Sequence, residues 1–348
     1  MRIDDAARAV RTRPMLLRRG MAQASIEAAV RDGSLKRIGR GSYVDASVWD
    51  AANHEAQHLM SVVSAHRRAD RDIVFSHVTA CLLHGLPLVR HVPGRVHTSG
   101  AQLNGRVMRS EPEVARHQVA VPDSDVVVVA GIRCTTLARS VADTIRYVPE
   151  ETAISIADAA MRRVAWDDAG RRYDSDAAER FRVDVRSKLP VGGRGVKQAR
   201  YAIGLADGRA QGPGESISRL YLVQLGYRTP RLQVPVRGPK GADLHLDMVL
   251  DDVARVAEFD GKVKYVDPEM RAGRPMEDVL LAEKAREDWI RGVTGLPVVR
   301  WAWDDIASID TLRRRLRAFG MYPPPPAIAN PHSVTRARTE TRTNGLLQ

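Results

Sequence analysis

Two neighbouring stretches between residues 242 and 265 carry the side chains best suited to chemistry. The stretch ADLHLDMVL alternates, and VARVAEFDGKVKY follows after Asp251-Asp252, a pair typical of a turn, so the two stretches are predicted to form a β-hairpin. The alternation puts one set of residues on each face of the first strand: Leu244, Leu246, Met248 and Leu250 on one, and His245, Asp247 and Val249 on the other.

The second strand of this hairpin places four residues at period two on one face, namely Val256, Glu258, Asp260 and Lys262. The hairpin is therefore expected to bring Asp247 beside Glu258 and Asp260, with Lys262 at the far end. Carboxylates that close repel one another in a dry site unless a cation neutralises them. Their hard oxygen atoms suit Mg²⁺ or Mn²⁺. The alternative is a solvated hairpin edge, but the apolar neighbours of Asp247 and Glu258 predict partial burial.

The elements around the hairpin must position these carboxylates. GPGESISRLYLVQLG is predicted as a helix entered at Glu215, and LPVVRWAWDDI as a closing strand. Between them, LLAEKAREDWIRGV is predicted as an amphipathic helix whose cations would hold a phosphate backbone: Lys284, Arg286 and Arg291.

The order helix, strand, strand, helix, strand resembles the restriction-endonuclease core. Together with RLQVPV, LDMVL, AEFDGKVKY, EKAREDWIR and VVRWAW it resembles the PD-(D/E)xK domains related to very-short-patch-repair endonucleases. This resemblance implies that Asp247 is the metal-binding aspartate, Glu258 the acid of the D/ExK element, and Glu215 the helix acid that supports the metal through water. The chain departs from the pattern where Asp260 stands in the usual lysine position. Lys262 follows two residues later and is the lysine that would orient the attacking water.

The first 45 residues predict two helices and a hairpin. Gly20 separates the helices, a second helix start is expected at Ser25, and LKRIGRGSYV reads as two short strands with glycines between them, like a wing. This order is that of a winged helix-turn-helix, which binds the DNA major groove. A basic surface hairpin without a DNA role is the alternative. The candidate DNA contacts are Arg18, Arg19, Arg31, Lys36, Arg37 and Arg40.

A second resemblance covers roughly the first 165 residues. GRGSYV, SHVTACLLHGLPL and GIRCTTLARSVADTIRYVP, followed by IADAAMRR, look like the AbiEi-type antitoxin family. The family combines a winged helix with a small α/β domain and represses toxin–antitoxin operons by binding promoter DNA. The resemblance therefore adds a cognate toxin to double-stranded DNA as a candidate partner.

The other motifs and the two cysteines favour structural roles. His54-Glu55-x-x-His58 has the spacing of a zinc protease helix, but no third ligand is apparent, so we expect no stoichiometric zinc and dispensable His54 and His58. GPGES and VGGRGVK lack the spacing of a nucleotide-binding loop and are expected to be loops. Cys81 and Cys134 lie in apolar contexts and are predicted core residues rather than nucleophiles.

The composition limits the partners and the cellular location that the protein can have. The 348 residues carry 54 Lys and Arg against 42 Asp and Glu, a formal charge of +12 that favours polyanionic partners. No apolar run is long enough for a membrane span, and the N-terminus lacks the apolar run of a secretory signal, so a cytoplasmic protein without membrane contact is expected. Two cysteines exclude a disulfide scaffold.

The expected fold class is multidomain α/β. It comprises a winged helix-turn-helix over residues 1–48, an antitoxin-like α/β domain over 49–170, a linker or helical connection over 171–210, an endonuclease-like core with a mixed sheet flanked by helices over 211–320, and a disordered tail over 321–348. The leading functional hypothesis is a Mg²⁺-dependent DNA endonuclease delivered to duplex DNA by the winged helix. The alternatives are a repressor or antitoxin with an inactive nuclease-like domain and, third, a zinc protease. The pattern does not predict an oligomeric state.

Overall fold

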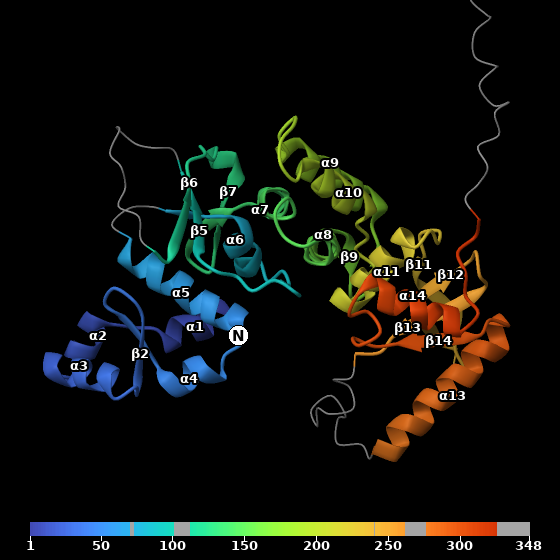
Figure 1. Cartoon of the computed structure of the whole chain (residues 1–348), viewed down its shortest axis with the longest axis horizontal. Coiled ribbons are helices and arrows are strands. Elements are labelled where there is room, and N and C mark those ends of the chain that lie inside the picture. The colour runs from blue at the N-terminus through green and yellow to red at the C-terminus, as the bar shows by residue number, and fades with distance from the viewer. Residues whose placement is uncertain (70–72, 101–111, 240, 262–275, 326–348) are drawn as a thin grey trace, which may run out of the picture.

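The computed structural model describes residues 1–69, 73–100, 112–239, 241–261 and 276–325. It is a mixed α/β structure with several separate sheets. The chain runs from the N-terminal helices and sheets at one end, through a central group of helices, to a second large sheet at the other end (Figure 1). Across these ranges, none of the helices has the length and apolar character needed to span a membrane. The predicted tail falls mostly on residues 326–348, which lie outside the described part of the chain.

The N-terminal unit consists of three helices and a three-stranded antiparallel sheet in the order β1-β3-β2. The predicted order of two helices and a hairpin is present, but the second helix begins at Gln23 rather than Ser25. Gly41 has φ of +68° in the turn between the hairpin strands, a conformation that favours glycine. The elements are α1 (Ile3–Ala9), β1 (Arg11–Thr12), α2 (Arg13–Arg18), α3 (Gln23–Arg31), β2 (Leu35–Gly39) and β3 (Ser42–Asp45).

A five-stranded sheet follows, in the order β6-β5-β4-β8-β7. Residues 126–135 form a hairpin, because Ala130 and Gly131 both adopt positive φ and reverse the chain. Its first strand lies at the sheet edge, so Val128 is 65% exposed. The elements are α4 (Ala46–Ala51), α5 (His54–Arg68), β4 (Val74–Phe75), α6 (His77–Leu83), β5 (Val96–Ser99), β6 (Val114–His117), β7 (Val126–Val129), β8 (Ile132–Thr135) and α7 (Leu137–Thr144).

The central helices share one apolar cluster with this sheet. The segment expected as a linker or helical connection is helical, and Val185 and Ile203 from it are fully buried in that cluster. Gly195 is required where α10 begins, since an added Cβ would lie 1.9 Å from the carbonyl oxygen of Arg146. The elements are α8 (Glu150–Ala165), β9 (Trp166–Asp167), β10 (Arg172–Tyr173), α9 (Ser175–Lys188) and α10 (Val196–Leu205).

The C-terminal sheet is mixed and has the order β11-β12-β13-β14, with only the last pair parallel. The residues predicted to share one face of β12 divide between two apolar clusters. Met248 and Leu250 belong to a cluster that includes residues of α11 and α14. Leu246 belongs to a second cluster that includes Ile290 of α13, so helices supply apolar partners to both sets of β12 residues. The elements are α11 (Pro213–Gln224), β11 (Arg231–Arg237), β12 (Asp243–Leu250), β13 (Arg255–Phe259), α13 (Met276–Thr294), β14 (Val298–Trp301) and α14 (Ile309–Ala318).

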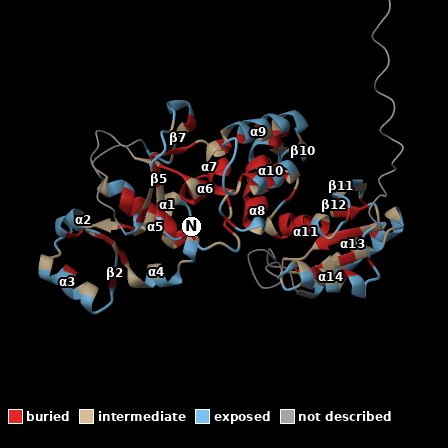
Figure 2. Cartoon of the chain, turned by 45° about the horizontal axis from the view of Figure 1, so that its top comes forward, coloured by how far each residue is buried: buried red, intermediate tan, exposed pale blue. Residues whose placement is uncertain are grey.

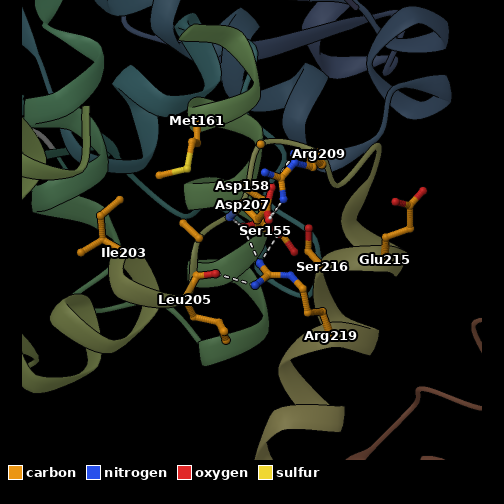
Figure 3. Close-up of polar contacts among 12 residues, drawn as sticks. Ser155, Asp158, Met161, Ile203, Leu205, Asp207, Arg209, Glu215, Ser216 and Arg219 are labelled. Carbon is orange, nitrogen blue, oxygen red and sulfur yellow. Dashed lines mark hydrogen bonds and ion pairs between the residues drawn. The ribbon is translucent and has the colours of Figure 1, made fainter. Parts of the chain in front are cut away.

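A buried ion pair joins α8 to α11. Both carboxylate oxygens of Asp158 accept hydrogen bonds from Nη2 of Arg219 at 2.7 Å, and the side chains are 1% and 0% exposed. Arg219 also donates to the carbonyl of Leu205, and the backbone N–H of Asp207 donates to Asp158. Burial raises the pKa of Asp158, against the influence of Arg219. Figure 3 shows Glu215 on the same helix pointing away from this pair, and Figure 2 shows that both helices carry buried residues.

Removing the carboxylate at position 158 should destabilise the protein strongly. The Asp158→Ala variant leaves the Arg219 guanidinium buried without its ionic partner, which costs about 3–5 kcal/mol. Asp168→Ala is the matched control, because Asp168 pairs with Arg162 but its side chain is 84% exposed; we expect a loss below about 1 kcal/mol there. Urea unfolding measures both variants, and equal small losses would contradict the role given to the buried pair.

Candidate active site

A polar cavity of about 330 Å³ lies at the end of the C-terminal hairpin, and it collects most of the carboxylates predicted from sequence. Asp247 reaches it from β12, Glu258 from β13, and Asp260 from the residues just after β13. We call it the carboxylate cavity. Its lining comprises Arg171, Gln211, Gln233, Asp243, Leu244, His245, Asp247, Glu258, Phe259, Asp260, Glu283, Arg286 and Arg300.

The register of the hairpin explains why Asp247 and Glu258 meet. Met248 pairs with Ala257, so one step further along the same antiparallel register Asp247 falls opposite Glu258. Residues opposite each other in such a pair project from the same face of the sheet. The backbone N–H of Phe259 donates to Oδ2 of Asp247 at 3.2 Å, which holds that carboxylate against the second strand.

Glu258 is the most heavily compensated carboxylate of the cavity. It is 7% exposed, and two guanidinium groups reach its two oxygens. Arg286 of α13 donates to Oε1 at 2.5 Å, and Arg300 of β14 donates to Oε2 through Nε and Nη2 at 3.1 and 3.0 Å. Glu258 and Arg300 are register partners in the parallel pair β13–β14. Both carboxylate oxygens of Glu258 are thus bound by arginine side chains.

Glu215 stands behind Asp247, at the start of α11. It is 8% exposed, and its Oε2 accepts a hydrogen bond from the backbone N–H of Gln211 at 3.0 Å. Burial raises the pKa of Glu215 to about 8, and the negative charge of Asp247 adds to the rise. Glu215 therefore stays largely protonated near neutral pH unless a positive charge binds close to Asp247.

The basic residues predicted for this region differ in their exposure and in their partners. Arg286 lines the cavity but donates to Glu258 and to the carbonyl of His245, so it does not face outward as a phosphate contact. Lys284 is exposed on α13. Arg291 is exposed and forms an ion pair with Glu287 at 2.6 Å. Lys262 lies outside the described residues.

Two cavity residues carry no signal in the sequence pattern. Arg300 reaches Glu258 only through the parallel register of β13 and β14, which periodicity cannot predict. Gln233 is 6% exposed and adopts φ of +49°, an uncommon conformation for a residue with a side chain. Its Oε1 accepts a hydrogen bond from Gln211, and its Nε2 has no partner among the residues that the structure describes.

The predicted DNA contacts of the N-terminal unit are all exposed, but few of them lie on one helix. Arg18 and Arg19 lie at the end of α2, and Arg31 lies at the end of α3. The others belong to the hairpin: Lys36 and Arg37 on β2, and Arg40 in its turn. The positive charge therefore flanks α3 and covers the hairpin, rather than following α3 along its length.

The His54-Glu55-x-x-His58 motif does not present its three side chains to one point. His54 is exposed, whereas His58 is 3% exposed and its Nε2 is 2.8 Å from Oγ1 of Thr79. Glu55 accepts a hydrogen bond from the backbone N–H of Leu88. Burial lowers the pKa of His58 to about 4. These contacts indicate separate structural roles for the motif's residues.

Both cysteines lie in the core, as predicted, with exposures of 0%. Burial raises the pKa of Cys81 to about 12 and that of Cys134 to about 11. A thiol with so high a pKa carries little thiolate at neutral pH and is a poor nucleophile.

Comparisons with known proteins add relatives without an assigned activity. No protein-family model matches the chain. The uncharacterized proteins MT2308 and Rv2248 of Mycobacterium tuberculosis are each 29% identical over 132 residues, which is 38% of this chain and 44% of theirs. The chain thus spans less than half the length of the curated relatives it matches. The crystal structure of the RV2827C protein from Mycobacterium tuberculosis is similar over 58% of this chain and 79% of that one, at 12% identity and a TM-score of 0.32.

Cation binding in the carboxylate cavity should release a proton. A divalent cation beside Asp247 favours the ionised form of Glu215, whose pKa of about 8 keeps it protonated near pH 7. Calorimetric titration with Mn²⁺ in buffers of different ionisation enthalpy should show about one proton released per ion. The release should disappear in Glu215→Gln, and in the wild type well above the pKa, where Glu215 is already ionised. Equal release by wild type and variant would contradict this assignment.

Proposed function

We propose that the protein is a divalent-cation-dependent DNA endonuclease, brought to duplex DNA by its N-terminal unit. The observation that carries the proposal is the meeting of Asp247, Glu258 and Asp260 in one cavity, with Glu215 buried behind them. Carboxylates on a hairpin of a mixed sheet, with a further acid on the preceding helix, are the arrangement expected of the PD-(D/E)xK resemblance.

The charge of the carboxylate cavity fits a divalent cation. Five acidic residues and three arginines line it, and burial lowers the pKa of His245, so the lining carries a formal charge of −2. Its oxygen donors are hard ligands of the kind that Mg²⁺ and Mn²⁺ prefer. A cation near Asp247 would also relieve the repulsion that helps to keep Glu215 protonated.

Asp247 and Glu258 are the residues that would hold Mg²⁺ or Mn²⁺. Such an ion supplies an activated water and neutralises charge on the phosphate during hydrolysis. Binding it would require Glu258 to give up at least one of its two arginines, and Arg286 would then be available in the cavity, where its guanidinium could bind a phosphate oxygen. Glu215, once ionised, can accept a proton or orient water behind Asp247. Asp260 can serve as a further oxygen ligand.

The N-terminal unit supports the DNA-binding half of the proposal. Its element order, α1-β1-α2-α3-β2-β3 with a tight turn between the last two strands, is the one expected of a winged helix. The six exposed cations around α3 and on the hairpin would bind phosphates on either side of a groove. Sequence preference would come from the uncharged side chains of α3, such as Gln23 and Ser25.

A DNA-binding repressor or antitoxin is the second candidate, and one observation favours it. Glu258 already has two arginine partners, so the cavity is partly neutralised without a cation. In that case the Arg286–Glu258–Arg300 network is a structural link between α13, β13 and β14, and the C-terminal sheet would serve binding or dimerisation.

Cleavage tests the proposal directly. Plasmid DNA incubated with the protein and Mg²⁺ or Mn²⁺ should be nicked, and EDTA should prevent it. Asp247→Ala and Glu258→Gln should each reduce the rate by at least about 10²-fold, the scale for removing one group that acts in the transition state. DNA binding should persist or tighten, since a negative charge facing phosphate is lost.

Asp251→Asn is the matched control for these variants. Asp251 lies in the turn directly after β12 and pairs with Arg231 at the surface. The Asp251→Asn variant should therefore cleave DNA at the rate of the wild type. Thermal unfolding of all variants checks that they fold. If folded wild-type protein cuts neither duplex, single-stranded nor mismatched DNA with either ion, the repressor assignment replaces the nuclease.

DNA binding should depend on the hairpin cations. The double variant Arg37→Ala, Arg40→Ala should bind duplex DNA more weakly across sequences, and each lost phosphate contact should reduce the slope of log K against log salt by about one unit. Arg8→Ala is the control, because Arg8 is exposed in the same unit but pairs with Asp5 on α1. Fluorescence anisotropy at several salt concentrations measures both. Unchanged binding by the double variant would exclude the hairpin as the DNA contact.

A further inference from the structure

Three histidines meet at the edge of the five-stranded sheet, far along the chain from the carboxylate cavity. His77 begins α6, His97 lies on β5 and His117 ends β6. One ligand atom from each ring lies within 4.8 Å of the others, the only such group of three found among the described residues. Nδ1 of His97 is 2.9 Å from Nε2 of His117. Figure 1 shows α6, β5 and β6 side by side, so the three segments are brought together by the fold.

These distances suit a transition-metal ion. Zinc–nitrogen bonds of 2.0–2.1 Å in a tetrahedron put the ligand nitrogens about 3.4 Å apart. The rings of His77 and His117 are stacked, with centroids 3.7 Å apart and an angle of 15° between planes. Lone pairs of two nearly parallel rings cannot meet at one point, so one of these rings must turn when an ion binds.

The surroundings of His77 give one of its ring nitrogens a hydrogen-bond partner. Its Nδ1 is 3.0 Å from Oγ of Ser76, and this oxygen also accepts a hydrogen bond from Ser99. When Nε2 binds a metal ion, Nδ1 carries the proton and can donate it to this hydroxyl oxygen, as in many metal sites where the second nitrogen donates to the protein. His77 also adopts φ of +52°, a strained conformation that occurs preferentially at functional sites.

The charge of the surroundings is mixed. Burial lowers the pKa of His77 to about 3 and that of His97 to about 4. Arg95, Arg139 and Arg146 act on the cluster with positive charge, and His58 and His91 also face it. Asp143, 8% exposed and bound to Arg139, supplies negative charge next to His117.

We propose that His77, His97 and His117 form a Zn²⁺ site with solvent in the fourth position. Imidazole nitrogens suit zinc, and all three residues are half-buried, so water can reach the ion. The ion ties β6, at the edge of its sheet, to β5 and α6. This site is separate from the proposed nuclease centre and from the His54–His58 motif, on which the expectation of no stoichiometric zinc was based.

Zinc titration of EDTA-treated full-length protein tests the site. The background is the double variant Asp247→Asn, Glu258→Gln, so that the carboxylate cavity does not contribute ions. One Zn²⁺ should bind per chain and raise Tm by roughly 5 °C at a hundredfold excess over Kd. Adding His97→Gln or His117→Gln should abolish both effects, while His54→Gln, which changes an exposed histidine, should change neither.

Cobalt gives a readout that does not depend on stability. Co²⁺ in place of zinc should show the intense visible bands of a tetrahedral site, and these bands should be absent in His117→Gln even if that variant is folded and stable. Zinc that is lost in His58→Gln but retained in His117→Gln would overturn the proposal and assign the ion to the His54–His58 motif. Absence of binding to the folded protein would also overturn it.

Discussion

The buried pair between Asp158 and Arg219 is the constraint on which the C-terminal half depends. A guanidinium and a carboxylate with no solvent exposure tolerate little displacement, because either group left unpaired carries a large desolvation cost. The pair fixes the rotation of α11 against α8. Ser218, the residue before Arg219, accepts a hydrogen bond from Nε1 of Trp301 on β14 at 2.8 Å. One turn of α11 thus positions Glu215, and through Trp301 it also positions the strand that carries Arg300.

Close packing completes this arrangement at the start of α11. A Cβ added to Gly214 would lie 2.0 Å from the ring of Phe259, so only glycine lets the helix approach the end of β13. Phe259 in turn donates its backbone N–H to Asp247. Glu215 and Asp247 are held by different elements that pack tightly. Their carboxylates therefore cannot move apart to relieve the repulsion between them. This repulsion is relieved either by protonation of Glu215 or by a bound cation. The proposed function depends on the bound cation.

Local patterns in the sequence were sufficient for some of these features. Period-two alternation and the Asp251-Asp252 turn predicted the hairpin that joins Asp247 and Glu258, since both signals are local. The role of Arg300 was not predictable, because it depends on a parallel register set by the whole β13–α13–β14 crossover. Likewise, the three histidines of the proposed zinc site come from separate segments whose proximity is a property of the sheet order.

In the proposed nuclease, the carboxylate cavity holds a divalent cation in exchange for an arginine. Anomalous diffraction from crystals grown with Mn²⁺ tests this most directly, because it locates the ion and shows the position of Arg286 in the same experiment. We expect a Mn²⁺ peak bound by Asp247 and Glu258, with Arg286 turned away from Glu258. A cavity without a peak, in which Arg286 and Arg300 both remain on Glu258, would contradict it.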